Sequence, residues 1–136
     1  MKVYMSGSIY GGREKLETYK QIIKELEKYA EVINKNIADD EVLEKEAMQK
    51  DEDVFTDLEL KLKSADLIFA EVTIPSLGAG YELGFADSIG KNVIGIYDKT
   101  ITQKVSTMIR GNKRITLIPY ENINEILDNL KEILKI

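Results

Sequence analysis

Several residue types that commonly carry enzyme chemistry are missing from this sequence. Its 136 residues include no cysteine and no histidine. The lack of cysteine excludes a disulfide framework and thiol chemistry. The lack of both residues excludes ordinary zinc sites and Ser-His or Cys-His nucleophile systems. Any catalysis therefore has to come from carboxylates and hydroxyls.

Basic segments and long apolar runs are scarce as well. The chain has 19 lysines and arginines against 24 aspartates and glutamates, a formal net charge of −5. This balance argues against nucleic-acid binding, although a small anionic ligand needs only a few well-aimed donors. No apolar run approaches the roughly 18 residues that cross a membrane, and the N-terminus leads into a strand without a signal peptide. We therefore expect a cytoplasmic protein with no membrane partner.

The length and the apolar fraction of 43% suit a single domain over residues 1–136. Strand and helix patterns alternate, which predicts an α/β fold of the Rossmann or flavodoxin-like type, with about five parallel strands and helices on both faces. The predicted strands are 2–5, 31–34, 66–72, 92–97 and 114–118. The predicted helices are 16–30, 54–65, 78–89, 102–110 and a last one that starts at an Asn122–Glu125 capping box. The acidic stretch 38–53 is predicted to be a solvated helix or loop.

The loop after the first strand is rich in glycine. Gly7, Gly11 and Gly12 fall within six residues, which indicates a backbone that approaches something closely or adopts positive φ. A strand, a glycine-rich turn and a helix can cradle a phosphate, and a plain tight turn explains the same pattern. The loop lacks the spacing of a dinucleotide or P-loop motif, so neither type of site is supported.

The stretch 65–84 reads as a buried strand that stops at Pro75 and passes through two glycines into a helix. Glu82 falls in the first turn of the helix predicted over 78–89. In open α/β sheets, ligands bind in the crevice at the carboxyl ends of the strands. The helix dipole would help to keep such a carboxylate ionised, by roughly 0.3–1 kcal/mol. Glu82 is therefore the first candidate for chemistry.

A second carboxylate, Asp57, lies beside the apolar face of the helix predicted over 54–65. Two carboxylates that face each other across a substrate are the usual apparatus for breaking a glycosidic bond. On spacing alone, Asp57 can equally be an exposed helical carboxylate. The meeting of Asp57 with Glu82 is a hypothesis at this point.

Three motifs carry a family resemblance. The segments 4–14, 70–84 and 106–111 resemble motifs of the 2'-deoxynucleoside 5'-monophosphate N-glycosidases. These enzymes belong to the nucleoside 2-deoxyribosyltransferase superfamily. The resemblance runs from Lys2 to about Tyr120, and the central motif is long and specific.

The resemblance implies that a deoxynucleoside monophosphate and water give deoxyribose 5-phosphate and a free base. Glu82 matches the family's nucleophile, which attacks C1' and forms a glycosyl-enzyme intermediate that water resolves. Asp57 matches the general acid/base, and Tyr4 matches a tyrosine that positions the nucleophile. No metal or organic cofactor is implied.

The resemblance also implies how the substrate is held. Ser8 and Ser76 match phosphate contacts. Ser106 matches a phosphate contact from the other subunit, which implies a homodimer with shared sites. Further pocket residues implied by the matching motifs are Ser6, Gly7, Ile9, Tyr10, Gly11, Gly12, Arg13, Tyr19, Asn36, Gly78, Gly80, Thr107 and Met108.

The sequence departs from the family pattern at three places. Tyr10 stands where an arginine helps to hold the substrate, and Asn36 stands where a histidine is typical near the base. The segment from Asp57 to Asp66 is one residue longer than usual, which on a helix is a rotation of about 100°. Glu59 or Asp53 is therefore an alternative to Asp57 as the acid/base.

Three functions are compatible with these residues. The first is hydrolysis of deoxynucleoside monophosphates. The second is transfer of deoxyribose between bases on nucleosides without phosphate, and the third is a non-catalytic nucleotide-binding module. The three matched serines favour a 5'-phosphate and hence the first. Paired carboxylates argue against the third, because they would repel a phosphate without a chemical use.

Overall fold

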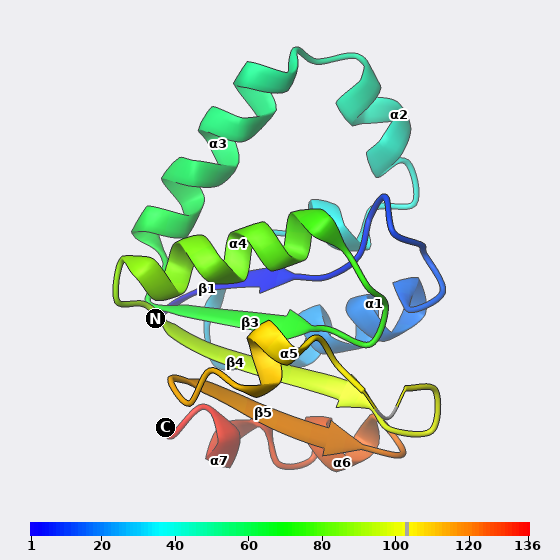
Figure 1. Cartoon of the computed structure of the whole chain (residues 1–136), viewed down its shortest axis with the longest axis vertical. Helices are drawn as coiled ribbons and strands as arrows, with labels where there is room; N and C mark the ends of the chain where they lie inside the picture. Colours follow the sequence, from blue (N-terminus) through cyan, green and yellow to red (C-terminus); the bar gives the residue numbers. More distant parts are fainter. Residues whose placement is uncertain (103) are drawn as a thin grey trace.

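The computed structural model describes residues 1–102 and 104–136, which form a five-stranded parallel sheet with the strand order β2-β1-β3-β4-β5 (Figure 1). All four pairs of neighbouring strands are parallel. This order is the flavodoxin-like one, so the predicted fold class is confirmed. The strands are β1 (Lys2–Ser6), β2 (Glu31–Asn34), β3 (Leu67–Glu71), β4 (Asn92–Asp98) and β5 (Ile115–Tyr120).

Helices cover both faces of the sheet. On one face, α1 (Leu16–Leu26), α6 (Asn124–Leu127) and α7 (Leu130–Ile133) pack against a buried cluster that includes Val3 and Met5. On the other face, α3 (Asp51–Ser64), α4 (Leu77–Ser88) and α5 (Thr107–Arg110) pack against a second cluster that includes Tyr4. Successive strand residues point to opposite faces, which places Tyr4 and Ser6 on the side of α4. None of the described helices is long and apolar enough to span a membrane.

Strands β1 and β3 end beside each other in the middle of the sheet. Ser6 pairs with Ala70 in the register, and every residue of β3 is buried, as expected for a central parallel strand. The loops that follow the two strands therefore leave the same edge of the sheet. This edge is where the sequence predicts the ligand crevice.

The acidic stretch 38–53 is helical over much of its length. It contributes to a 3₁₀ turn η1 (Asn36–Ala38), to α2 (Val42–Ala47) and to the start of α3. Figure 1 shows α2 and the first half of α3 as an arch that stands away from the sheet. Most of its side chains are exposed, in agreement with the predicted solvated segment.

Two predicted helices need correction. The helix predicted over 102–110 is the single turn α5, because Ser106 caps it and accepts a hydrogen bond from the Met108 N–H at 3.3 Å. Gln103, within that predicted span, lies outside the described residues. The single last helix is instead α6 and α7, although the predicted cap is present: the Asn122 N–H donates to the Glu125 carboxylate at 3.3 Å.

Strand β5 continues through Pro119, where we expected the strand to have ended. In the register, Pro119 pairs with Tyr97 of β4. Proline cannot donate to a neighbouring strand, and it is tolerated here because β5 is an edge strand.

A buried polar network ties together the ends of β3, β4 and β5. The Glu71 carboxylate accepts hydrogen bonds from the Thr73 N–H at 2.6 Å, from the Thr73 hydroxyl at 2.9 Å and from the Tyr120 hydroxyl. The Asp98 N–H donates to the Thr73 hydroxyl oxygen at 2.8 Å, and Lys15 pairs with Asp98 at 2.7 Å. Burial and the adjacent Glu71 carboxylate raise the pKa of Tyr120. The network fixes the start of the loop that leads to α4.

We expect Tyr120→Phe to lower the free energy of unfolding by about 1–3 kcal/mol, because it removes a donor from a buried carboxylate. The measurement is urea unfolding followed by circular dichroism. Tyr29→Phe is the matched control: Tyr29 is exposed, and we expect a change within about 0.5 kcal/mol. Equal effects of the two substitutions would show that the Tyr120–Glu71 bond does not stabilise the fold.

Candidate active site

Glu82 of α4 is held against the carboxyl end of β1 by two side chains. The Tyr4 hydroxyl donates to Oε2 of Glu82, and the Ser6 hydroxyl donates to Oε1 at 3.3 Å. Tyr4 and Ser6 share one face of the strand because side chains alternate with a period of two. Both oxygens of the carboxylate are thereby oriented by the sheet.

The electrostatics of Glu82 differ from the sequence-based expectation. Burial raises the pKa of Glu82 to about 7, although the hydrogen bonds from Tyr4 and Ser6 act to lower it. The helix dipole contributes less than we predicted. The helix starts at Leu77, after the N-cap Ser76, so Glu82 lies in its second turn, and the dipole effect falls off within the first turn. Burial and the Glu82 charge also raise the pKa of Tyr4.

The glycine-rich loop after β1 lies directly against the loop after β3. A side chain at Gly11 would collide with the carbonyl oxygen of Pro75, and Gly12 has a φ of +143°. Both readings of the glycine pattern, close approach and positive φ, are therefore confirmed. Tyr19 of α1 anchors the loop, because its hydroxyl accepts a hydrogen bond from the Ser8 N–H at 2.9 Å.

Ser8 is the one residue of this loop whose polar side chain is buried and unsatisfied: its hydroxyl oxygen has no hydrogen-bond partner among the described residues. Buried polar groups are nearly always paired, so an unpaired hydroxyl in a glycine-rich loop is a candidate ligand contact. Arg13, a predicted pocket residue, makes hydrogen bonds within the protein. Its guanidinium donates to the backbone oxygens of Ser8, at 3.1 Å, and Asp39, at 3.0 Å. It thus holds the loop against the segment after η1.

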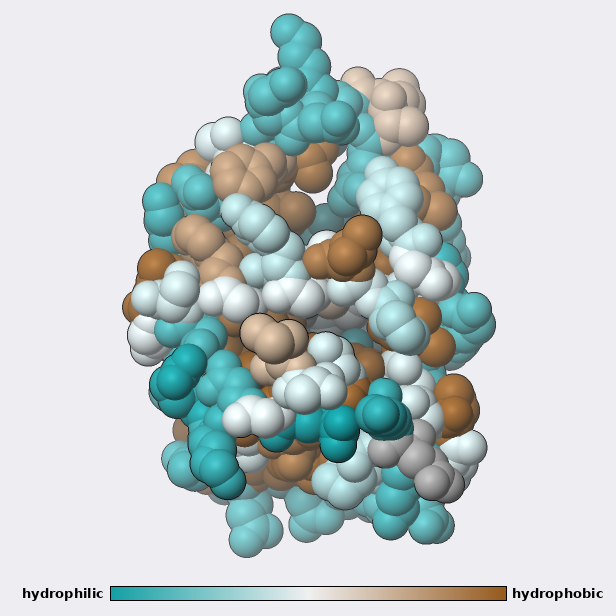
Figure 2. Space-filling model, in the orientation of Figure 1, coloured by the Kyte–Doolittle hydropathy of each residue, from teal (hydrophilic) through white to brown (hydrophobic). Residues whose placement is uncertain are grey.

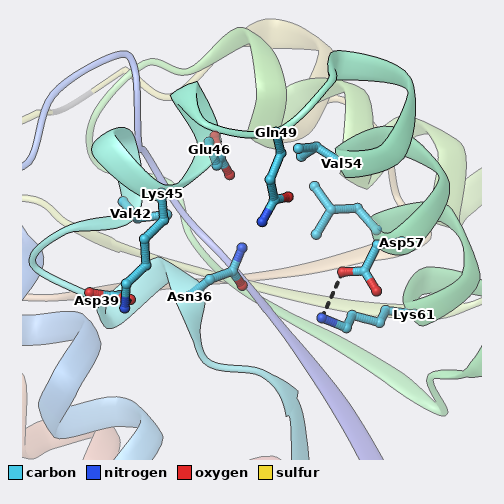
Figure 3. A pocket seen from close by; sticks show the side chains of 10 residues that line it. Asn36, Asp39, Val42, Lys45, Glu46, Gln49, Val54, Asp57 and Lys61 are labelled. Carbon is cyan, nitrogen blue, oxygen red and sulfur yellow. Dashed lines mark hydrogen bonds and ion pairs between the residues drawn. The ribbon is translucent and has the colours of Figure 1, made fainter.

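A cavity of about 210 Å³ opens beneath the arch of α2 and α3, where Figure 2 shows a hollow in the surface. Figure 3 shows the carboxamides of Asn36 and Gln49 and the carboxylate of Glu46 turned toward its interior. Asp57 also lines the cavity and is paired with Lys61 at 2.8 Å. The cavity is lined by Asn36, Asp39, Val42, Lys45, Glu46, Gln49, Val54, Asp57, Leu58 and Lys61.

Asp57 lies near the group formed by Tyr4, Ser6 and Glu82, here called the Glu82 cluster. Its charge is among the causes that raise the pKa of Tyr4, after burial and Glu82. Among the described residues, no hydrogen bond joins Asp57 to Glu82. Of the two alternatives, Glu59 is paired with Lys63 at 3.2 Å and Asp53 is exposed, and neither lines the cavity.

The remaining predicted residues lie at helix starts and on the surface. The Ser76 hydroxyl accepts a hydrogen bond from the Ala79 N–H at 3.2 Å, and Gly78 and Gly80 are exposed on the same turn of α4. Ser106, Thr107 and Met108 start α5 and are exposed. Ile9 is half-buried, whereas Tyr10 is exposed beside Glu46, and its pKa is raised by desolvation and by that carboxylate.

Sequence reasoning missed Glu46 and Gln49, which line the cavity. Both belong to the acidic stretch that was predicted to be solvated. The only signal was an excess of charge, and such a run is usually a solvated surface.

Comparisons with known proteins agree with this geometry. Residues 3–118 match the nucleoside 2-deoxyribosyltransferase family. A protein of Nematostella vectensis, provisionally named 2'-deoxynucleoside 5'-phosphate N-hydrolase 1, is 42% identical over 113 residues, which cover 81% of this chain and 76% of the relative. The 5-hydroxymethyl-dUMP N-hydrolase of Rattus norvegicus is 40% identical over 111 residues, 80% of this chain and 68% of the relative.

A solved structure shares the fold. The CMP N-glycosidase of Clostridium botulinum superposes with a TM-score of 0.71, at 23% sequence identity, over 98% of this chain and 99% of that one. The family match covers most of the chain, and both relatives align over four-fifths of it. The chain belongs to the nucleoside 2-deoxyribosyltransferase family.

Proposed function

We propose that this protein hydrolyses the N-glycosidic bond of 2'-deoxynucleoside 5'-monophosphates and releases deoxyribose 5-phosphate and a free base. The observation that carries the proposal is the Glu82 carboxylate, oriented by Tyr4 and Ser6 at the end of β1, where the loops that carry the Ser8 and Ser76 hydroxyls meet. The names of the relatives, which are N-hydrolases of deoxynucleoside monophosphates, support the same reaction. The whole chain, 1–136, serves as one catalytic domain in this proposal.

In the first step, an oxygen of Glu82 attacks C1' of the deoxyribose and the bond from C1' to the base nitrogen breaks. Tyr4 and Ser6 hold the carboxylate in position for this attack. Asp57 is the proposed acid/base: it delivers a proton to the departing base, directly or through a water molecule, and later takes a proton from the attacking water. Hydrolysis of the ester at Glu82 then releases deoxyribose 5-phosphate.

The 5'-phosphate is proposed to lie between the loops after β1 and β3. The unpaired Ser8 hydroxyl and the Ser76 hydroxyl, whose proton is free to be donated, are the proposed contacts, together with nearby backbone N–H groups. A phosphate subsite favours the hydrolase over the transferase that acts on nucleosides. We propose no nucleic-acid partner, and cytoplasmic location stays a prediction from the sequence.

A second copy of the chain is proposed to complete the site. The side chains of Leu77 and Met108 are 97% and 83% exposed, and Tyr81, which contacts Phe55 edge to face at 6.3 Å, is 62% exposed. Large exposed apolar side chains are typical of an interaction surface. Ser106 lies two residues before Met108, so a partner that covers this surface also meets Ser106. In the proposed homodimer, Ser106 contacts the phosphate bound in the partner's site.

We expect Glu82→Gln to reduce release of base from deoxynucleoside monophosphates by at least about a thousandfold, because the nucleophile is lost while the size of the side chain is kept. The measurement is chromatography of the free base. Glu132→Gln, on the exposed surface of α7, is the matched control and should keep full activity. Unchanged turnover by Glu82→Gln would rule out the assigned nucleophile. Incubation with a deoxynucleoside and a different free base separates the alternatives, since a new nucleoside would indicate transfer and free sugar alone would indicate hydrolysis.

We expect kcat/KM to rise with pH through an apparent pKa near 7, because only the ionised form of Glu82 is a nucleophile and burial raises its pKa to about 7. The Tyr4→Phe variant removes a hydrogen bond that lowers this pKa, so its profile should shift to higher pH. The measurement is kcat/KM between pH 5 and 9. A profile that shifts to lower pH or does not move would contradict the assigned Tyr4–Glu82 coupling.

Mixing two impaired variants tests the shared site. In a heterodimer of Glu82→Gln and Ser106→Ala, one of the two sites combines the native Glu82 of one subunit with the native Ser106 of the other. If subunits exchange at random, about one quarter of all sites regain wild-type activity. Recovery is measured after joint refolding of the two variants. No recovery, or elution of the protein as a monomer, would contradict the shared site.

A further inference from the structure

The cavity beneath the arch holds a carboxylate without a cationic partner. Asp39 and Asp57 are paired with Lys45 and Lys61, at 2.5 Å and 2.8 Å. Glu46 makes no ion pair with any described residue and turns into the cavity (Figure 3). The Tyr10 hydroxyl lies beside this carboxylate as one hydrogen-bond donor, and the two carboxylate oxygens can accept further hydrogen bonds and have none to donate. Glu46 therefore fits a ligand that brings N–H groups to this wall.

The remaining polar groups of the cavity suit the edge of a heterocyclic ring. Asn36 and Gln49 face the interior with carboxamides, which can donate through nitrogen and accept through oxygen. The volume of about 210 Å³ is below the roughly 300–1,000 Å³ of pockets that enclose a drug-sized ligand. It is therefore suited to one ring system rather than to a whole nucleotide.

The cavity lies on the same side of the sheet as Tyr4, Ser6 and Glu82. Leu58, which lines the cavity, packs against the same buried cluster as Tyr4. Phe55 of α3 contacts Tyr81, the residue before Glu82, with ring centroids 6.3 Å apart. The Glu46 charge is also one of the influences that raise the pKa of Glu82, after burial. In the proposed complex, a sugar bonded to Glu82 places its base under the arch.

We propose that Glu46 makes this enzyme select nucleobases that carry an exocyclic amino group, an inference that rests on the proposed hydrolysis of deoxynucleoside monophosphates. The amino groups of cytosine, adenine and guanine can donate to the Glu46 carboxylate, as carboxylates accept from the cytosine amino group in nucleic-acid recognition. Uracil-type bases have a carbonyl oxygen in place of the cytosine amino group. Facing Glu46, it would put two acceptors opposite each other. The selectivity separates this chain from the rat relative, which is named for a uracil-type base.

Rates with dCMP and dUMP test the proposal, because their bases differ at the 4-amino position. We expect kcat/KM of the wild type to be at least about fivefold higher for dCMP. The Glu46→Gln variant should bring this ratio close to one, because a carboxamide can pair with either group. Glu44→Gln is the matched control: it is the same substitution on the same helix, at an exposed residue outside the cavity, and should keep the wild-type ratio.

The proposed selectivity would be overturned by equal kcat/KM for the two nucleotides in the wild type. A ratio that Glu46→Gln leaves unchanged would overturn it as well. In either case, release of base would still support the proposed hydrolase. If no base is released from any deoxynucleotide, the proposed function fails, and binding decides the selectivity instead. Calorimetry of dCMP and dUMP with the wild type and Glu46→Gln should then show the same preference and the same loss of it. Equal dissociation constants would overturn it.

Discussion

The hydrogen bond from Tyr4 to Glu82 joins the two parts of the structure on which the proposed chemistry depends. Tyr4 belongs to β1, which lies inside the sheet between β2 and β3, and Glu82 belongs to α4, which covers one face. The bond fixes a carboxylate that burial drives toward protonation, with a pKa of about 7. With a pKa of about 7, a substantial fraction of the Glu82 carboxylate is ionised at neutral pH, as the proposed attack on C1' requires. The carboxylate is also desolvated enough to be reactive.

The proposed site is built from two kinds of element, which are loops anchored to the sheet and an exposed helical arch. The loops after β1 and β3 are anchored by Tyr19, by Arg13 and by the network around Glu71. The arch of α2 and α3 stands off the sheet and is rich in charge, with ion pairs across its own surface. Sugar and phosphate are thus proposed to meet the rigid part of the molecule, and the base to meet the exposed part. The base is one of the features that differ between the substrates in the names of the rat relative, 5-hydroxymethyl-dUMP, and of the Clostridium botulinum structure, CMP.

The sequence predicted much of the fold because local patterns and burial agreed along most of the chain. The buried strand before Pro75 and the apolar face of α1 are clear periodic signals, and both are present. The predicted span of α5 was too long, because the helix begins only after Ser106, whose side chain caps it through a local hydrogen bond. The end of β5 was predicted too early, at Pro119, because an edge strand tolerates proline. Whether a strand lies at the edge depends on the strand order, which local sequence does not reveal.

For the site, the motifs predicted Tyr4, Ser6 and Glu82, which meet in the structure. Glu46 and Gln49 could not be predicted, because a charged stretch does not reveal which of its side chains an arch turns inward. The raised pKa of Glu82 could not be predicted from the sequence either, since it comes from burial by distant segments rather than from the position of Glu82 in the helix.

The most direct test of the central claim is to find the bond between enzyme and sugar. A deoxynucleoside monophosphate with fluorine at C2' slows the oxocarbenium-like steps, so that a glycosyl-enzyme accumulates. Mass spectrometry of the digested protein should then place a fluorinated deoxyribose 5-phosphate on the peptide that contains Glu82. Release of base with an adduct on another residue, or with no adduct at all, would contradict the role assigned to this carboxylate.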